Sequence, residues 1–277
     1  MKKIIFSCIL TGFAFCFQHL YSQGINKKSV DSIIKKAPSF SIHEDNYFIS
    51  GIPLNEDINK STADAKYQIS FKQLMTRNTL PWDTYLFLTY TQKAFWNIYE
   101  NSSPFQEINF NPGLGLGKPI YNNKKRLVGL ASVSFEHESN GRDSIFSRSW
   151  NSIRLKYSTM IGEKTTITAE AWAPFLYKDG NPDLFDYIGP AELNIKHNFI
   201  PKRLIGKLML RKGLEWNWQG AYRARLLYRP FKMSNQYFML EWFNGYAESL
   251  INYDEHVNMI RIGYVIKSRE LNILKKQ

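Results

Sequence analysis

The most constraining feature of this chain is a succession of segments, each about ten residues long, in which apolar and polar residues alternate. Alternation with a period of two indicates strands that have one apolar and one polar face. Turn residues separate the segments, and no amphipathic segment of helical length follows residue 45. This pattern is typical of an antiparallel transmembrane β-barrel, for which an even strand number of about 12 is expected. The predicted strands are residues 46–54, 65–76, 82–93, 105–117, 125–138, 149–160, 164–176, 187–199, 203–215, 219–229, 236–244 and 257–268.

The composition agrees with strands of this kind. Hydrophobic residues make up 44% and aromatic residues 15% of the chain, while the mean hydropathy is −0.36. This is too polar for a bundle of membrane-spanning helices and too aromatic for a disordered chain. The formal net charge of +12 favours either anionic lipid headgroups as partners or solvated cationic loops, and we expect no nucleic acid partner for an exported chain.

The N-terminus carries an export signal. Lys2 and Lys3 precede an apolar run from residue 4 to residue 17. That run is shorter than the ~20 residues that a spanning helix needs. We therefore predict that residues 1–22 form a secretory signal peptide.

The rest of the chain divides into three predicted parts. Residues 23–45 have a weak helical period and are predicted as a mobile or peripheral N-terminal arm. Residues 46–268 are predicted as the barrel and residues 269–277 as a C-terminal tail. Both cysteines, Cys8 and Cys16, lie in the predicted signal peptide, so a mature chain without it has no thiol for a disulfide, a metal site or a nucleophile.

Side chains two apart in a strand share a face, and a barrel in a bilayer turns its apolar face outward. The odd positions of three consecutive predicted strands are mostly apolar, so we expect this odd face to contact lipid. His137, Ser139 and Asn151 are odd as well, and therefore end the lipid-facing stripe instead of lining the lumen. If the hairpin pairs them, Asn151 lies across from His137 at ~5 Å. The odd positions of the first of these strands are Leu127, Gly129, Ala131, Val133 and Phe135.

This arrangement suits nucleophilic catalysis. A serine hydroxyl is a weak nucleophile until a base takes its proton, and His137 shares a face with Ser139 at i and i+2. The base needs a partner that fixes its tautomer, and the side-chain oxygen of Asn151 can accept the imidazole N–H. An amide is neutral, which matters at the edge of a bilayer, where a buried carboxylate is costly.

The loop after the serine offers the remaining groups. The glycine of Asn140-Gly141-Arg142 allows a backbone N–H to approach an oxyanion closely. Ser144, Ser147 and the loop carbonyls are hard oxygen ligands for a cation such as calcium, which polarises an ester carbonyl. Serine, asparagine and glycine are also ordinary turn residues, so a polar loop without a catalytic role is the alternative. The lipid-facing histidine favours the catalytic interpretation.

The stretch HESNGRDSIFSRSWN, residues 137–151, resembles the active-site segment of outer-membrane phospholipase A, a family of calcium-dependent barrel esterases of Gram-negative bacteria. Further segments resemble family segments in the same order, so that the resemblance covers roughly residues 46–268. These segments are Tyr90-Thr91-Gln92-Lys93, Ser102-Ser103-Pro104-Phe105, Asn181-Pro182-Asp183 and Gly245-Tyr246-Ala247-Glu248-Ser249-Leu250.

The resemblance implies a twelve-stranded barrel with its site on the outer surface, near the outer-leaflet interface of the Gram-negative outer membrane. His137 is implied as the base, Ser139 as the nucleophile and Asn151 as the orienting residue. The backbone N–H of Gly141 is implied as the oxyanion donor.

The resemblance also implies a calcium ion and a homodimer. The Arg142 carbonyl and the Ser147 hydroxyl are the implied calcium ligands, and Ser102 is the best match for the ligand that the partner subunit adds. Gln92 resembles a glutamine at the family's dimer interface. Here, however, Ser144 stands where family members carry an acidic residue of the calcium loop.

Our first interpretation is therefore an enzyme, a calcium-dependent serine phospholipase that hydrolyses the sn-1 and sn-2 acyl esters of membrane phospholipids. One alternative is a non-catalytic outer-membrane channel or structural barrel, and another is a lipid A deacylase. Asp179 and Asp183 are either secondary calcium ligands or, in the sequence Asp-Gly-Asn-Pro-Asp, turn formers.

Overall fold

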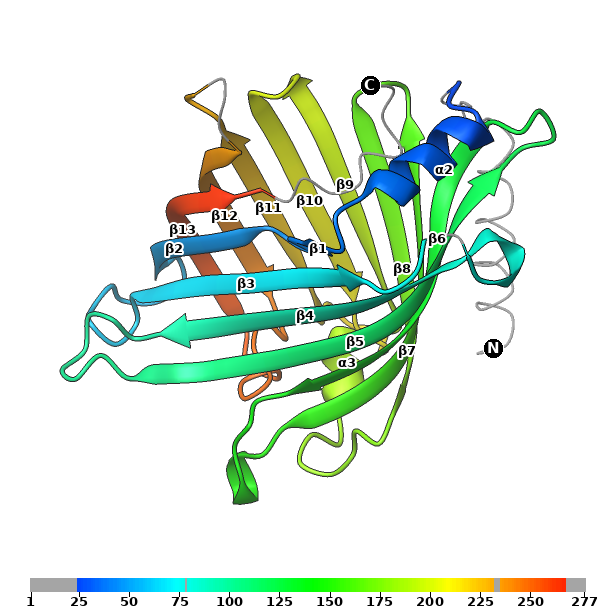
Figure 1. Ribbon diagram of the computed structural model, residues 1–277. Coiled ribbons are helices and arrows are strands. Elements are labelled where there is room, and N and C mark those ends of the chain that lie inside the picture. Colours follow the sequence, from blue (N-terminus) through cyan, green and yellow to red (C-terminus); the bar gives the residue numbers. More distant parts are fainter. Residues whose placement is uncertain (1–23, 78, 232–234, 268–277) are drawn as a thin grey trace.

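The computed structural model describes residues 24–77, 79–231 and 235–267. The predicted signal peptide and the predicted C-terminal tail lie outside these residues. Twelve antiparallel strands form one closed sheet (Figure 1), because β2 pairs with β13 and β3 pairs with β4. The strands are β2 (Asn46–Pro53), β3 (Asp64–Leu74), β4 (Tyr85–Trp96), β5 (Phe105–Tyr121), β6 (Leu127–Ser139), β7 (Ser149–Ile161), β8 (Thr165–Phe175), β9 (Ala191–Ile200), β10 (Leu204–Lys212), β11 (Gly220–Tyr228), β12 (Gln236–Gly245) and β13 (Val257–Ile266).

This architecture confirms the predicted fold class, an all-β transmembrane barrel with about 12 strands. Two of the predicted strands begin later than expected. The short helix α3 (Leu184–Ile188) occupies the start of the segment predicted as 187–199, and the 3-10 turn η2 (Pro81–Asp83) occupies the start of 82–93. Both segments are apolar enough to resemble strands, but they lie outside the sheet.

The two rims of the barrel differ. Hairpin connections of three to ten residues join the strands at one rim, which we call the turn end: residues 75–84 are the longest of them, and 162–164 and 201–203 are the shortest. The other rim, the loop end, carries residues 54–63, 97–104, 140–148, 176–190, 213–219 and 246–256. Among the described residues, no helix has the length and apolar character needed to cross a membrane.

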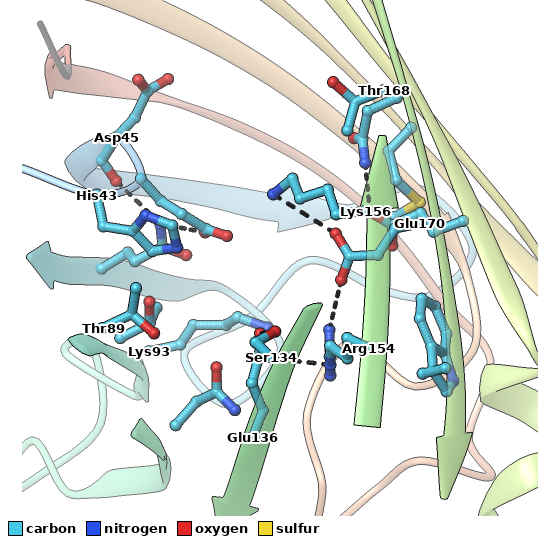
Figure 2. A pocket seen from close by; sticks show the side chains of 18 of the residues that line it. His43, Asp45, Thr89, Lys93, Ser134, Glu136, Arg154, Lys156, Thr168 and Glu170 are labelled. Atoms are coloured by element: carbon cyan, nitrogen blue, oxygen red, sulfur yellow. Dashed lines mark hydrogen bonds and ion pairs between the residues drawn. The ribbon is translucent and has the colours of Figure 1, made fainter. Parts of the chain in front are cut away.

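The lumen is polar and charged. It encloses a cavity of about 480 Å³ whose wall includes the ion pairs of Arg154 with Glu136 and Glu170, at 3.2 and 2.9 Å (Figure 2). Below the loop end, Lys66 lies between two buried carboxylates and bonds Glu248 at 2.6 Å. Buried charges persist only where they are paired. The Lys66 pairs join β3 to β12 and to the loop 246–256, across the two strands that lie between β3 and β12.

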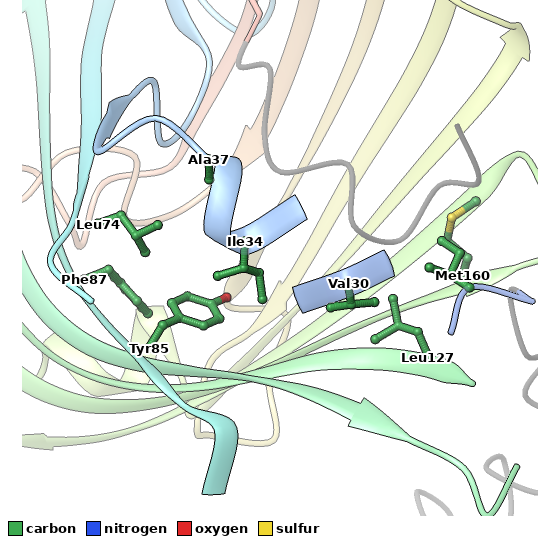
Figure 3. Close-up of a cluster of buried hydrophobic side chains, with 9 residues drawn as sticks. Val30, Ile34, Ala37, Leu74, Tyr85, Phe87, Leu127 and Met160 are labelled. Carbon is green, nitrogen blue, oxygen red and sulfur yellow. The ribbon is translucent and has the colours of Figure 1, made fainter. Parts of the chain in front are cut away.

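The N-terminal arm is not peripheral, which corrects the expectation from sequence. Helix α2 (Lys27–Lys36) starts at Asn26, whose side-chain oxygen accepts the N–H of Ser29 at 2.9 Å. Its apolar residues Val30 and Ile34 are fully buried inside the turn end (Figure 3). They belong to a cluster that also contains Ile25, Ala37, Leu74, Tyr85, Phe87, Leu127 and Met160.

Leu127 was predicted on the lipid-facing stripe, and this prediction is wrong. The pairing of β5 with β6 shifts by one residue between Ile120 and Tyr121. Such a bulge turns the following side chains to the other face. Leu127 is therefore fully buried against α2, while Val133 and Phe135 further along β6 remain exposed on the outer face.

After α2 the arm adds a short strand, β1 (Phe40–Ser41), to β3 beyond the end of β2. Phe40 lies 61% exposed, with its ring centroid 5.2 Å from that of Phe71. His43 and Asp45 line the lumen cavity, where Asp45 pairs with Lys207 at 2.5 Å. β1 and β2 are thus two parts of the first barrel strand, and the residues between them turn into the lumen.

Candidate active site

The hairpin of β6 and β7 brings two members of the predicted triad, His137 and Asn151, together. Its register places His137 directly opposite Asn151 and Ser139 opposite Ser149. The Nδ1 atom of His137 lies 3.0 Å from Oδ1 of Asn151, within hydrogen-bond distance. The base and its predicted orienting residue are therefore held by antiparallel pairing, which fixes cross-strand neighbours on one face.

That face points away from the lumen. Phe135 and Ile153 continue it toward the middle of the barrel, Phe175 lies beside Asn151, and all three are exposed on the outer surface. Phe175 pairs with Asn151, and its ring centroid is 5.9 Å from that of Phe135. The histidine–asparagine pair thus stands at the end of an apolar stripe.

The intervening residues point inward. Glu136 pairs with Arg154 in the lumen, and Glu138 accepts the indole N–H of the buried Trp150 at 3.0 Å. These inward contacts fix the pleat of both strands, and with it the outward direction of their neighbours. The placement of the polar residues on the membrane side is the one that the alternation predicts.

Ser139 is half-buried and lies two residues after His137, opposite Phe110 of β5. Its hydroxyl forms no hydrogen bond with the imidazole among the described residues. Catalytic hydrogen bonds are often long before substrate binds. The link between serine and histidine is therefore part of the proposal below.

The loop of residues 140–148 is organised by Asn140, a residue for which no role was predicted. Its buried side chain accepts the N–H of Arg148 at 3.0 Å and that of Arg142 at 3.3 Å. It also donates to the carbonyl of Phe146 at 2.8 Å. One amide therefore holds both ends and the tip of the loop in a fixed shape.

Gly141 adopts a left-handed conformation, with φ +64°. This conformation is favourable only for a residue without Cβ, and a Cβ here would also lie 3.0 Å from the ring of Phe110. Among the described residues, the Gly141 N–H has no hydrogen-bond acceptor. It is free to donate to a group bound beside Ser139.

The carbonyls of residues 140–142 are left without a hydrogen-bond donor among the described residues. The carbonyls of residues 143–148 all accept hydrogen bonds, two of them from the guanidinium of Arg148, at 2.9 and 3.0 Å. The Arg142 carbonyl and the Ser147 hydroxyl make no hydrogen bond with the described residues. Uncharged oxygens in such a position are hard ligands. No group of three or more His, Cys, Asp or Glu side chains suited to a metal occurs among the described residues, so a cation here depends on serine and backbone oxygens.

A second loop, residues 176–190, supports the first. The fully buried Asn181 accepts the N–H of Ser149 at 3.1 Å and donates to the Tyr177 carbonyl at 2.5 Å. Gly180 packs so closely that a Cβ would lie 2.5 Å from the Ser147 carbonyl oxygen. The sequence indicated a turn at Asn181-Pro182, but not that this turn would brace the neighbouring hairpin.

Asp183 contacts a third loop instead of the predicted cation site. It accepts the hydroxyl hydrogen of Tyr253 and precedes α3, while Asp179 is exposed to solvent. Burial, reinforced by the Asp183 carboxylate, raises the pKa of the Tyr253 phenol. The phenol therefore remains a donor and joins loop 176–190 to loop 246–256.

The two residues implied for dimer contacts lie apart from the hairpin. Ser102 is exposed in the loop 97–104, with φ +65°. Gln92 lies on the outer face of β4, where its side chain accepts from Tyr90 at 3.1 Å and donates to Tyr67 at 3.4 Å. An amide on an otherwise apolar, membrane-facing surface needs a polar partner.

A closed barrel that carries its polar site on the membrane side differs from a porin, whose polar surface is the lumen. This combination of a closed barrel and a membrane-facing polar site is typical of outer-membrane enzymes that act on lipids. The sequence model described as phospholipase A1 matches residues 37–266. The chain therefore belongs to the phospholipase A1 family.

Individual relatives that match this chain are also phospholipases A1. Phospholipase A1 of Escherichia coli strain K12 is 28% identical over 212 residues, which cover 73% of this chain and 69% of that protein. Phospholipase A1 of Proteus vulgaris is 25% identical over 259 residues, covering 91% and 78%. As a member of this family, the chain is a phospholipid hydrolase of the Gram-negative outer membrane.

Solved structures share the fold. The Salmonella typhi outer membrane phospholipase dimer with bound calcium superimposes with a TM-score of 0.72 at 24% identity, covering 86% of this chain and 96% of that one. Outer membrane phospholipase A of Escherichia coli gives 0.71 at 24% identity, covering 83% and 99%.

Proposed function

We propose that this protein is a calcium-dependent serine phospholipase A, active as a dimer, that cleaves the sn-1 and sn-2 acyl esters of membrane phospholipids. The observation that carries the proposal is the 3.0 Å contact between His137 Nδ1 and Asn151 Oδ1 on the lipid-facing side, two residues from Ser139. A polar pair in this position costs free energy, so its presence indicates a function.

In the proposed reaction each group has a role that its geometry supports. With Nδ1–H donated to the Asn151 oxygen, the other ring nitrogen, Nε2, is left to accept the proton of Ser139. The hydroxyl oxygen attacks the ester carbonyl, and the imidazolium then protonates the departing glycerol oxygen. Water, deprotonated by His137, hydrolyses the acyl-enzyme in the second half of the reaction.

The Gly141 N–H supports stabilisation of the oxyanion, because it lacks an acceptor and is held beside the serine by the Asn140 loop. The donor set of the same loop fits calcium: the Arg142 carbonyl and the Ser147 hydroxyl are among the loop oxygens that accept no hydrogen bond from the described residues. Bound calcium supplies positive charge that polarises the ester carbonyl.

We propose that the protein dimerises through its lipid-facing surface, which also carries the candidate active site. Two protein oxygens are few for calcium, which takes 6–8 oxygen ligands, so further ligands must come from water, substrate or a second copy. Ser102 of a second copy is our proposed ligand, and Gln92 our proposed contact in the interface. The solved Salmonella typhi relative, a dimer with bound calcium, supports this arrangement.

The proposal is tested by labelling the purified protein with a serine-reactive sulfonyl fluoride, in detergent with calcium, and measuring its mass. We expect one adduct, located on Ser139, and loss of fatty-acid release from phospholipid micelles. Ser139→Ala should take no adduct and release no fatty acid, whereas Ser158→Ala, a lumen-lining serine on neighbouring β7, should behave like the wild type. Calcium-dependent release by Ser139→Ala would show that the nucleophile is misassigned.

A panel of substrates separates the remaining alternatives. Phospholipids labelled in the sn-1 or the sn-2 chain and lipid A are offered to the same preparation, with and without a calcium chelator. We expect both phospholipid positions to be cleaved only with calcium. Cleavage of lipid A alone would assign a deacylase, and no cleavage of any lipid would leave a non-catalytic barrel.

A further inference from the structure

Large apolar side chains project into the surroundings beside the candidate site. Ile145 and Phe146, at the tip of the loop 140–148, are 79% and 53% exposed. Leu176, the first residue after β8, is 81% exposed. These three side chains, which we call the rim tips, lie beyond the strand ends at the loop end of the barrel.

The backbone that presents them is strained. Leu176 has φ +49° and Ser144, next to Ile145, has φ +54°. A bulky residue in the left-handed region is unusual, and strain of this kind concentrates at functional sites. A glycine would hold the same conformation at Leu176 at lower cost, so the conformation alone does not explain a leucine.

The rim tips are carried on one braced support. Asn181 bonds the backbone N–H of Ser149, and Gly180 packs on the Ser147 carbonyl, so the loops 140–148 and 176–190 cannot move independently. The support is continuous with the triad: Phe175, next to Leu176, is the cross-strand partner of Asn151. A contact made by the rim tips is therefore made at a fixed position relative to the triad.

The surface that the rim tips extend already faces lipid. They prolong the outer stripe of Phe135, Ile153 and Phe175 past the strand ends. Arg142 and Arg148 belong to the same loop, and cationic side chains attract anionic headgroups. Apolar side chains flanked by cations suit the boundary between headgroups and acyl chains.

We propose that Ile145, Phe146 and Leu176 form a docking surface for lipid of the outer leaflet. This surface holds headgroups and upper acyl chains against the catalytic loop, so that the ester of a phospholipid in the bilayer reaches Ser139. The inference rests on the proposed phospholipase function and adds the surface by which the enzyme takes substrate from a bilayer. A molecularly dissolved ester does not need this surface.

The test compares two substrates. The double variant Ile145→Ser/Leu176→Ser is assayed, with calcium, on long-chain phospholipid in bilayers and on a short-chain phosphatidylcholine kept below its critical micelle concentration. We expect the ratio of the two kcat/KM values, bilayer over dissolved, to fall at least roughly 10-fold, since two large apolar contacts with lipid are removed. The matched control is Leu54→Ser/Ile58→Ser, exposed apolar residues of the loop 54–63 at the same end, for which the ratio should stay constant.

The other outcomes overturn the inference. An unchanged ratio means that the rim tips do not take part in lipid docking, and an equal fall on both substrates means that they position the catalytic groups. A fall that follows a loss of dimer, measured by chemical cross-linking, identifies a second copy as the occupant. Wild-type protein inactive on both substrates would defeat the proposed function instead.

A second readout does not depend on activity. Cysteine is placed at position 145 or 176, labelled with a fluorophore in the mature chain and reconstituted with lipids that carry a quencher in the upper acyl chain. We expect stronger quenching at both positions than for a label at Asn217, at the tip of the loop 213–219. Equal quenching at the three positions would count against a specific lipid contact.

Discussion

The two ends of this barrel are closed by different means. At the turn end, the apolar face of α2 is buried among lumen-facing apolar side chains, including Tyr85, Leu127 and Met160. At the loop end, the elements that hold the structure are polar: the amides of Asn140 and Asn181 bond backbone groups of neighbouring loops. Both sets of contacts are buried, but the apolar contacts and the polar contacts determine different properties of the molecule.

Apolar packing is non-directional and tolerates rearrangement. A buried amide fixes distances, because each unsatisfied polar group costs free energy. The turn end therefore contributes mainly to the stability of the barrel, and the loop end mainly to the position of a few atoms beside Ser139. Substitutions that affect stability and activity separately test this contrast.

The largest effect is expected for His137→Ala. Removal of the base from a serine–histidine pair lowers kcat by roughly 10³-fold or more. His137 is half-buried on the outer face, outside the packed clusters, so we expect the fold to remain intact. The measurement is fatty-acid release at saturating calcium, together with guanidinium unfolding in detergent. A variant that unfolds at lower denaturant and loses activity in proportion would contradict the separation of the two ends.

The opposite result is expected for Ile34→Ala in α2. The side chain is fully buried, and such truncations lower the free energy of unfolding by about 2–5 kcal/mol. Activity per folded molecule should not change, since α2 lies at the far end from the triad. Lys35→Ala, an exposed neighbour on the same helix, is the matched control. Equal unfolding midpoints for the two variants would show that α2 does not stabilise the barrel.

The barrel itself could be predicted from sequence because it depends on a local pattern. Alternation with a period of two and turn residues at regular spacing require no knowledge of distant contacts. The orientation of His137 and Asn151 followed from the same pattern and from the short connection that makes β6 and β7 a hairpin. These are the parts of the site that the structure reproduces.

The parts that could not be predicted depend on contacts between distant segments. Only two buried side chains, Val30 and Ile34, dock α2, and their partners come from several strands. The bulge that turns Leu127 inward leaves no clear mark in the sequence. Asn140 and Asn181 read as turn residues, because the carbonyls and amides that they bond become neighbours only after the loops fold.

Two buried asparagines, one at the loop end and one at the turn end, test the contrast between the two ends of the barrel more sharply. Asn181→Ala removes the acceptor of the Ser149 N–H and the donor to Tyr177, so we expect kcat/KM to fall by roughly 10²-fold through misplacement of the hairpin. Asn198→Ala removes a 2.7 Å bond to the Lys164 carbonyl at the turn end and should lower stability alone. If both variants lost activity equally, the loop end would have no special part in positioning.

The smallest effect concerns Gly180. Gly180 and Gly162 both have positive φ, +85° and +61°, so alanine strains the backbone at either position by about 1 kcal/mol. Only at Gly180 does the new Cβ collide with something, the Ser147 carbonyl oxygen at 2.5 Å; at Gly162 nothing lies within 4 Å.

Because the Ser147 hydroxyl is a proposed calcium ligand, displacement of this residue should weaken calcium binding more than it slows the reaction. We therefore expect Gly180→Ala to raise the calcium concentration for half-maximal activity by roughly 10-fold, which corresponds to about 1.4 kcal/mol, and to approach wild-type rates at high calcium. Gly162→Ala should lower the unfolding midpoint slightly and leave the calcium titration unchanged. Coinciding titration curves for the two variants would show that loop 176–190 does not position the calcium ligands, and that the brace seen in the structure acts on stability alone.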